Sequence, residues 1–334
     1  MIRVAINGFG RIGRSFLRAY LLDKKAQSKY QIAAINIGPA TKDWVAHLFK
    51  YDSFMGTWPH SVAYENGHLH VGTYKIPLLT TLDPADLVWS ELGIDWVVES
   101  SGKFTDRENA NKHIQAGAKK VLVTAFATAP DVTIVLGVNE SMYNASEHAI
   151  VSLASCTANS LYPIVKVLHD SFDLQSIILN TMHSYTNRQV LMDVESVNLR
   201  RSRGAAVNII PTTLQCPQRM SEVYPKYTGN ISGQSTRVPV GKISFLDVAF
   251  TTDTVLHKND INHAFRQASN GDLKSILATS VEQLVSTDYT NTPYSVVVDE
   301  LLTVAVSPLY KVYAWYDNES GYSHRIKDFL TKYA

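Results

Sequence analysis

Cysteine is scarce in this chain, which has Cys156 and Cys216 among its 334 residues. Two cysteines do not make the disulfide framework of a small secreted domain. We therefore interpret each as a core residue or a reactive thiol in a reducing compartment. Residues 1–7 show no basic-then-apolar signal pattern, and no apolar run approaches the roughly 20 residues of a membrane span. A cytoplasmic protein is the expectation.

An excess of charge of one sign is also lacking. The chain has 31 Lys and Arg against 30 Asp and Glu, which gives a formal net charge of +1. The densest basic stretch, residues 199–203, is too local to form a basic face, so the composition implies no nucleic-acid or membrane partner. The length predicts two domains, and no internal repeat or low-complexity linker is found.

The first half of the chain alternates short apolar runs with helical patterns. Such runs are typical of buried parallel strands, and the alternation predicts a doubly wound parallel sheet with right-handed crossovers. The predicted strands are residues 4–6, 32–35, 96–98, 121–124, 133–136 and 149–153. Two predicted helices present apolar faces made of Phe16, Leu17, Tyr20 and Leu21 and of Trp44, Val45, Leu48 and Phe49.

The second half is richer in β pattern, which predicts a mixed or antiparallel sheet. The β-rich stretches are residues 176–185, 235–252, 294–306 and 311–316. We expect an α/β protein with a Rossmann domain at residues 1–154 and an α+β catalytic domain at residues 155–318. A closing helix at residues 319–334 is expected to join the Rossmann domain.

Residues 8–13 read Gly-Phe-Gly-Arg-Ile-Gly, a G-x-G-x-x-G pattern between a strand and a helix. In such a turn one glycine allows the tight bend, one lets the backbone approach a pyrophosphate, and one lets the helix pack closely on the strand. The helix start adds N–H groups and the positive end of its dipole. Gly8, Gly10 and Gly13 therefore predict a binding site for NAD or NADP, and a glycine-rich turn without a ligand is the alternative.

The acidic residue expected at the end of the second strand is missing. An Asp or Glu there would accept hydrogen bonds from the ribose hydroxyls and repel the 2′-phosphate of NADP. Ile37 occupies this place, after Asn36, which we keep as a candidate cofactor contact. We hypothesise a relaxed choice or a preference for NADP. Since no nearby Arg clearly replaces the acid, the choice of cofactor stays open.

Cys156 follows an apolar strand and precedes a helical pattern. A thiol at a helix start lies at the positive end of the dipole, which predicts a lowered pKa, and its N–H points to where an oxyanion would form. A buried structural cysteine is the alternative. His183 follows 27 residues later, after one helix and one strand, which returns it to the same sheet edge. The pair predicts a nucleophile with its base, whereas most other histidines are interpreted as solvated.

Ordered motifs run along the whole chain, at residues 7–14, 50–53, 99–105, 154–157, 183–186, 199–201, 237–239 and 315–319. In these motifs the sequence resembles the phosphorylating glyceraldehyde-3-phosphate dehydrogenases. The resemblance implies that Cys156 attacks an aldehyde, that a hydride passes to NAD or NADP, and that His183 takes up the proton. Phosphate would then release the thioester as 1,3-bisphosphoglycerate, a step of glycolysis and gluconeogenesis.

The resemblance also implies roles for further residues. Thr186 and Arg237 would bind the phosphate of the substrate, whereas Ser155, Thr157 and Arg201 would bind the attacking phosphate. The expected cofactor contacts are the amide of Asn318, the ring of Tyr322, and the backbone N–H groups of Arg11 and Ile12. The family is usually a homotetramer, in which the segment at residues 199–211 reaches the cofactor site of a neighbouring subunit.

Two departures from the family pattern concern the phosphate sites. Residues 212–217 replace a Ser-Thr-Gly-Ala-Ala stretch, and Leu214 and Gln215 are expected to weaken or rebuild the second phosphate site, with Cys216 structural. Arg188 replaces an Asp and is expected to add positive charge near the substrate phosphate. Two alternatives therefore stay open: an erythrose-4-phosphate dehydrogenase that releases its acyl group to water, and a non-catalytic redox-sensing relative.

Overall fold

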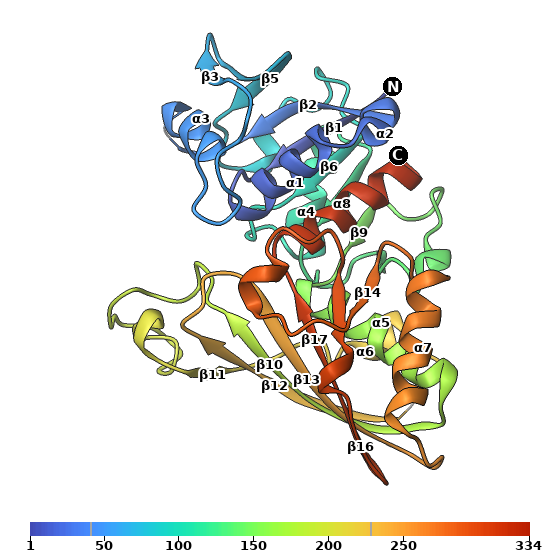
Figure 1. Ribbon diagram of the computed structural model, residues 1–334. Coiled ribbons are helices and arrows are strands. Elements are labelled where there is room, and N and C mark those ends of the chain that lie inside the picture. Colours follow the sequence, from blue (N-terminus) through green and yellow to red (C-terminus); the bar gives the residue numbers. More distant parts are fainter. Residues whose placement is uncertain (41, 228) are drawn as a thin grey trace. The chain divides into compact units, whose positions relative to one another are not determined.

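The computed structural model describes residues 1–40, 42–227 and 229–334 (Figure 1). The chain forms two compact units. The first contains residues 1–134, 140–155 and 323–334, and the second contains residues 135–139 and 156–322. Each unit combines helices with one sheet, which is mostly parallel in the first unit and mixed in the second. The predicted α/β fold class is confirmed.

The first unit has strands β1 (Ile2–Asn7), β2 (Tyr30–Asn36), β3 (Val62–Glu65), β4 (His68–Val71), β5 (Tyr74–Leu79), β6 (Trp96–Glu99), β7 (Lys120–Val123), β8 (Val132–Thr133) and β9 (Ile150–Ser152). Its helices are α1 (Arg11–Leu21), α2 (Lys24–Lys29), α3 (Lys42–Lys50), α4 (Arg107–Gln115) and most of α8 (Ser320–Tyr333), with short 3-10 turns η1 (Pro84–Asp86) and η2 (Glu140–Met142). Within the described residues, the strand order is β3-β4-β5-β2-β1-β6-β7-β9-β8.

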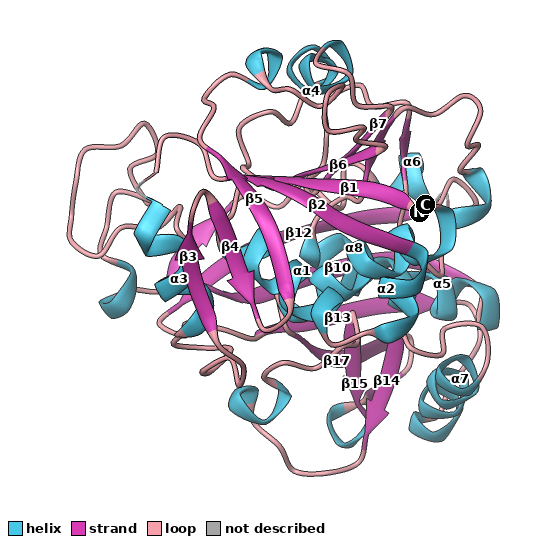
Figure 2. Cartoon of the chain, turned by 90° about the horizontal axis from the view of Figure 1, so that it is seen from above, coloured by secondary structure: helices cyan, strands magenta, loops and turns pink. Residues whose placement is uncertain are grey.

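The strand order reverses at β1, which lies between β2 and β6 (Figure 2). Asn7 at the end of β1 is in register with Asn36 on β2 and with Glu99 on β6. In-register residues of parallel strands point to the same face of the sheet, so these three polar side chains form a row. Ligands of open α/β sheets bind outside the carboxyl ends of the strands at such a reversal.

Three expectations for this half differ from the structure. Strands β3, β4 and β5 pair antiparallel and extend the parallel sheet, an extension that was not predicted. β8 ends at Thr133, so the predicted strand at residues 133–136 was wrong beyond its first residue. In α3, Val45 and Phe49 are buried but Trp44 is 68% exposed and Leu48 is 40% exposed. The face of α1 was predicted correctly for its buried residues Phe16, Leu17 and Tyr20.

The second unit has strands β10 (Leu174–Ser184), β11 (Ile210–Thr212), β12 (Asn230–Val238), β13 (Ser244–Thr252), β14 (Leu277–Ser280), β15 (Val296–Asp299), β16 (Val304–Val306) and β17 (Leu309–Tyr316). Its helices are α5 (Cys156–Ser171), α6 (Met220–Val223) and α7 (Lys258–Asn270), with 3-10 turns η3 (Ala205–Val207), η4 (Ser286–Tyr289) and η5 (Glu300–Leu302). In the described part, the strand order is β11-β12-β10-β13-β17-β15-β14, and β16 pairs with β17.

β10 lies inside this sheet, parallel to β12 and antiparallel to β13. Its alternate residues Ile177, Leu179, Thr181 and His183 are buried, so β10 ends with a histidine on the buried face. The β-rich stretch at residues 235–252 contains the end of β12 and all of β13, which lie on opposite sides of β10. The stretch at residues 294–306 is likewise divided into β15, η5 and β16. No helix in the described chain is long and apolar enough to span a membrane.

Candidate active site

The glycine-rich turn after β1 has little room for side chains on its inner side. Gly8 has φ +90°, and a Cβ built on it would lie 2.4 Å from the backbone nitrogen of Ser101. A Cβ on Gly13 would lie 2.4 Å from the carbonyl oxygen of Gly8. A Cβ on Gly10 would meet no atom of the described residues within 4 Å. Two glycines are therefore required by close approach, and the third faces open space where a ligand fits.

A pocket of about 540 Å³ opens beside this turn. Its lining comes from the turn itself, the end of β2, α3 and the loops near residues 81–82 and 100–104. No Asp or Glu is among its described lining residues, whereas Arg14 and Lys103 are. Ile37, Trp44 and Leu82 add apolar surface. The size is typical of a small-molecule site, and the absence of negative charge suits an anionic dinucleotide.

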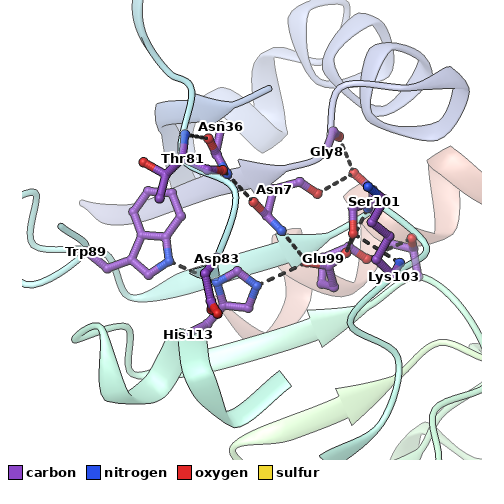
Figure 3. Close-up of polar contacts among 12 residues, drawn as sticks. Asn7, Gly8, Asn36, Thr81, Asp83, Trp89, Glu99, Ser101, Lys103 and His113 are labelled. Atoms are coloured by element: carbon purple, nitrogen blue, oxygen red, sulfur yellow. Dashed lines mark hydrogen bonds and ion pairs between the residues drawn. The ribbon is translucent and has the colours of Figure 1, made fainter. Parts of the chain in front are cut away.

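Asn36 lines this pocket, but its amide is already engaged (Figure 3). Its Nδ2 donates to Asn7 Oδ1 at 2.7 Å and to the carbonyl oxygen of Thr81 at 2.9 Å. Its Oδ1 accepts from the backbone nitrogens of Thr81 at 3.0 Å and Gly38 at 3.4 Å. An amide has two donor and two acceptor positions, so all four are used within the protein.

Arg11 and Ile12 form the first turn of α1, which Gly10 precedes without a side-chain cap. The guanidinium of Arg11 forms an ion pair with Asp52. Although burial of the Asp52 carboxyl opposes ionisation, the hydrogen bond from Arg11 lowers its pKa to about 2. The side chain of Arg11 is thus held by Asp52, and its backbone stands at the positive end of the helix dipole.

Cys156 and His183 are brought together in the second unit. Cys156 is the half-buried first residue of α5, and its Sγ lies 3.6 Å from His183 Nε2. The Nδ1 atom of His183 lies 2.7 Å from the carbonyl oxygen of Ser184. Because a carbonyl oxygen only accepts hydrogen bonds, Nδ1 carries the proton and the Nε2 lone pair faces the thiol. His183 is therefore oriented as a base toward Cys156.

The electrostatics favour neutral forms of both groups. Burial lowers the pKa of His183 to about 3, and the charge of Arg237 acts in the same direction. Burial also raises the pKa of the Cys156 thiol, and this effect exceeds the lowering by Arg237 and by hydrogen bonds from Thr157. The predicted lowering of the thiol pKa was therefore wrong in its net direction, because desolvation outweighs the helix start. The resting pair is a thiol beside a neutral imidazole.

Arg237 on β12 is in register with His183 on β10. Its Nη1 donates to the carbonyl oxygen of Ser184 at 3.1 Å, and its buried Nε has no hydrogen-bond partner in the described part of the chain. Burial lowers the pKa of Arg237, and the positive charges of Arg201 and Arg188 lower it further. The positive charges of Arg201 and Arg188 thus act on Arg237, which favours an anionic ligand beside it.

The other predicted phosphate residues are held by local contacts. The backbone nitrogen and hydroxyl of Thr186 both donate to Gln189 Oε1, at 2.9 and 3.1 Å. Nε of Arg201 donates to Thr212 Oγ1 at 2.9 Å, and Nη2 approaches the same oxygen. Thr212 belongs to the stretch that departs from the family pattern, so this stretch orients Arg201. Ser155 is half-buried and ends a segment of the first unit.

Thr157 is linked to His183 through Tyr316. The Tyr316 hydroxyl bonds to Thr157 Oγ1 at 3.0 Å and to Thr181 Oγ1 at 2.8 Å, and its ring meets that of His183 edge to face. Asn318 Oδ1 accepts from the hydroxyl of Ser184 at 3.0 Å. Tyr322 is buried in the first turn of α8.

Sequence reasoning missed three features of these sites. The carbonyl oxygen of Ser184 accepts hydrogen bonds from His183 and Arg237, and its hydroxyl donates to Asn318. The only sequence feature that could have indicated Ser184 was its place in the motif directly after His183. Tyr316 had a similar signal in the last motif. His113 is fully buried and was not singled out, since the sequence interpretation covered most of the other histidines only as solvated residues. Burial raises the pKa of the Cys216 thiol, as suits a structural cysteine. No metal-binding group of three or more His, Cys, Asp or Glu occurs in the described residues.

Comparison with known proteins adds two findings. Residues 2–107 match the family model of the glyceraldehyde 3-phosphate dehydrogenase NAD binding domain, and residues 155–318 match that of its C-terminal domain. The chain is 42% identical over 328 residues to glyceraldehyde-3-phosphate dehydrogenase of Geobacillus stearothermophilus and 43% identical to that of Priestia megaterium. Each alignment covers 98% of this chain and 96% of the relative. Chloroplastic glyceraldehyde-3-phosphate dehydrogenase A of Chlamydomonas reinhardtii is 43% identical over 98% of this chain and 87% of its own length.

Proposed function

Because the chain belongs to the glyceraldehyde-3-phosphate dehydrogenase family, we propose that it oxidises glyceraldehyde 3-phosphate to 1,3-bisphosphoglycerate with Cys156 as nucleophile and His183 as base. It is an NAD(P)-dependent oxidoreductase that acts on an aldehyde group. The contact of 3.6 Å between Cys156 Sγ and an unprotonated His183 Nε2 is the observation that carries the assignment of roles.

The first step forms a carbon–sulfur bond. His183 Nε2 takes the thiol proton as Cys156 Sγ attacks the aldehyde carbon, and the proton passes to the carbonyl oxygen to give a thiohemiacetal. A nicotinamide, when bound, would supply the acceptor for the hydride that leaves this carbon. His183 takes the hydroxyl proton at the same stage, which leaves a thioester on Cys156. His183 can take this role because its Nε2 is unprotonated in the neutral ring and faces the sulfur.

The second step transfers the acyl group to inorganic phosphate. A phosphate oxygen attacks the thioester carbon, the carbon–sulfur bond breaks, and the thiolate regains the proton that His183 took up in the first step. We assign the substrate phosphate to Arg237 and Thr186, and the attacking phosphate to Arg201, Thr157 and Ser155. Support comes from the unpartnered Nε of Arg237 and from Thr212, which fixes the guanidinium of Arg201.

The cofactor would occupy the pocket beside the glycine-rich turn. Gly8, Gly10 and Gly13 and the backbone of Arg11 and Ile12 would bind the pyrophosphate, where open space lies over Gly10. Asn36, with its amide engaged, would shape the pocket rather than contact the ribose. Because no acid lines the described pocket, we propose that NADP is accepted as well as NAD. Asn318 and Tyr322 would lie at the nicotinamide end.

We further propose a cytoplasmic homotetramer that works in glycolysis and gluconeogenesis. The nucleophile must be a free thiol, which suits a reducing compartment. The chain exposes Leu191, Met192, Val197 and Leu199 in one segment, and such a row of exposed apolar side chains is typical of a surface that another chain covers. Size-exclusion chromatography with light scattering tests the assembly.

The two alternatives are not favoured. The relatives bear the name of the glyceraldehyde-3-phosphate enzyme rather than the erythrose-4-phosphate enzyme. A redox sensor requires a stable thiolate, whereas burial raises the pKa of Cys156.

Absorbance of the reduced nicotinamide tests the function directly. Purified protein is given glyceraldehyde 3-phosphate with NAD or NADP, each with and without phosphate or arsenate. We expect steady turnover that requires the oxyanion. Turnover indifferent to phosphate, or a single burst without turnover, would instead support the hydrolytic enzyme, and erythrose 4-phosphate would be the next substrate to test.

A further inference from the structure

A row of buried polar side chains lies behind the cofactor pocket and takes no part in the mechanism above. Glu99 ends β6 and His113 lies in α4, and the side chains of both are fully buried. Neither is among the described residues that line the pocket. Burying a carboxylate is costly unless hydrogen bonds replace its water, so the partners of Glu99 indicate what it does.

The proton of His113 is placed by its two neighbours (Figure 3). Trp89 Nε1 lies 3.0 Å from His113 Nδ1, and an indole nitrogen only donates. Nδ1 is therefore unprotonated, and the proton of the neutral ring is on Nε2. This atom lies 3.1 Å from Glu99 Oε2, so His113 donates to the carboxylate.

Glu99 accepts hydrogen bonds at both oxygens. Oε2 accepts from His113 Nε2 and from Asn7 Nδ2. Oε1 accepts from the backbone nitrogen of Ser101 at 2.7 Å and from its hydroxyl. All four partners are donors, which is the arrangement that an ionised carboxylate satisfies and a neutral amide does not.

These contacts reach the pocket on two sides. Asn7 carries the row onward, because its Oδ1 accepts from Asn36, which in turn bonds both backbone groups of Thr81. On the other side the hydroxyl of Ser101 accepts from the backbone nitrogen of Lys103 at 3.2 Å. Asn7, Asn36, Thr81, Ser101 and Lys103 all line the pocket. One buried carboxylate thus holds the carboxyl ends of β1 and β6 and, through Asn7, that of β2.

We propose that Glu99, held by His113 and Trp89, is a positioning residue for cofactor binding. It fixes the Asn7 amide and the loop at residues 99–103, and it touches no cofactor itself. The proposal rests on the proposed function, which places the nucleotide in this pocket. A pocket preformed in this way binds its ligand without the cost of ordering the strand ends on binding.

The test is Glu99→Gln, which keeps the shape but replaces one acceptor oxygen with a donor. We expect the dissociation constants for NAD and NADP, measured by calorimetry, to rise about tenfold, as expected for the loss of one charge-assisted hydrogen bond. Turnover at saturating cofactor and the KM for the aldehyde should stay near those of the wild type. The matched control is Lys112→Gln, because Lys112 is the neighbour of His113 on α4 and pairs at 3.1 Å with Asp83 at the surface.

A pair of variants at His113 keeps the test decisive if Glu99→Gln does not fold. His113→Gln can still donate to Glu99 and accept from Trp89, so cofactor affinity should be retained, whereas His113→Leu should weaken it. The proposal is overturned if Glu99→Gln and His113→Leu bind cofactor like the wild type. It is equally overturned if His113→Gln and His113→Leu lose affinity, turnover and thermal stability together. A wild-type protein that binds neither NAD nor NADP would contradict the proposed function instead.

Discussion

His113 and His183 differ in the hydrogen-bond partners of their ring nitrogens, and this difference bears on what each histidine can do. His113 lies between an indole donor and a carboxylate acceptor, so both ring nitrogens have partners and no face is open to chemistry. His183 donates to a backbone carbonyl and turns its other nitrogen to a thiol. Both are buried, so burial alone does not distinguish the two roles that we propose for them.

The charged neighbour makes the difference. His113 lies against the carboxylate of Glu99, which accepts a hydrogen bond from the Nε2–H group of His113. His183 lies near the guanidinium of Arg237, whose charge lowers the pKa of the histidine beyond the effect of burial. The first arrangement holds a proton in place, whereas the second keeps a lone pair available. The comparison therefore predicts that the same substitution changes kcat at His183 but leaves it nearly unchanged at His113.

The strongest test is the substitution of Gln for each histidine. His183→Gln should lower kcat by about 10²–10⁴-fold, the usual contribution of a general base, because an amide cannot take the thiol proton. His113→Gln should leave kcat near that of the wild type. Steady-state kinetics with saturating glyceraldehyde 3-phosphate, cofactor and phosphate measure both. Equal losses in the two variants would remove the distinction between the histidines.

The second test removes the charge that sets His183 apart. Arg237→Gln should lower kcat/KM for glyceraldehyde 3-phosphate by about 10–100-fold, as expected for lost charge-assisted hydrogen bonds to a phosphate. Unphosphorylated glyceraldehyde, which lacks that phosphate, should be affected much less. Arg107→Gln is the control, because the half-exposed guanidinium of Arg107 pairs with Asp131 in the first unit and has no proposed role in the site. A similar loss with both aldehydes would show that Arg237 acts on the catalytic pair and not on the substrate phosphate.

A third test adds a charge to the cofactor pocket, whose described lining contains no acid. Ile37→Asp should lower the ratio of kcat/KM for NADP to that for NAD by about tenfold or more, because like charges in contact repel. The Asn side chain of the Ile37→Asn variant has nearly the shape of Asp but carries no charge. This variant should therefore change the ratio little. If both variants keep the wild-type ratio, the 2′-position of the cofactor does not lie at the end of β2.

The parts that sequence reasoning predicted depend on local pattern. The glycines at residues 8–13 and the thiol at the start of α5 are read from neighbours in the chain, and His183 follows from one helix and one strand. The hairpins of β3 to β5 were missed although Asn66 and Gly67, both with positive φ, form a hairpin turn signal. β4 alternates polar and apolar residues, and neither β4 nor β5 has the apolar run without interruption that predicted the other strands.

The parts that were missed depend on contacts between distant residues. His113 sits in a helix of largely polar sequence, and its burial is created by Trp89 and Glu99, which lie elsewhere in the chain. The thiol pKa was predicted from the helix start alone. The desolvation that reverses its direction comes from the packing of other elements around Cys156, which no local pattern reports.

The smallest expected effect is also the most direct probe of the protonation state of Cys156 and His183. A raised thiol pKa means that less of Cys156 is thiolate at a given pH, so alkylation by iodoacetamide near pH 7 should be slower than that of free cysteine. The rate should rise with pH through a midpoint above the usual value of about 8.5 for a cysteine thiol. Because the charge of Arg237 lowers this pKa, Arg237→Gln should move the midpoint to still higher pH.

Mass spectrometry across a pH series measures both, with buried Cys216 as the internal control that stays unmodified in the native protein. A rate that is already maximal at pH 6 would show a thiolate paired with a protonated His183, and the two histidines would then differ in charge as well as in their partners.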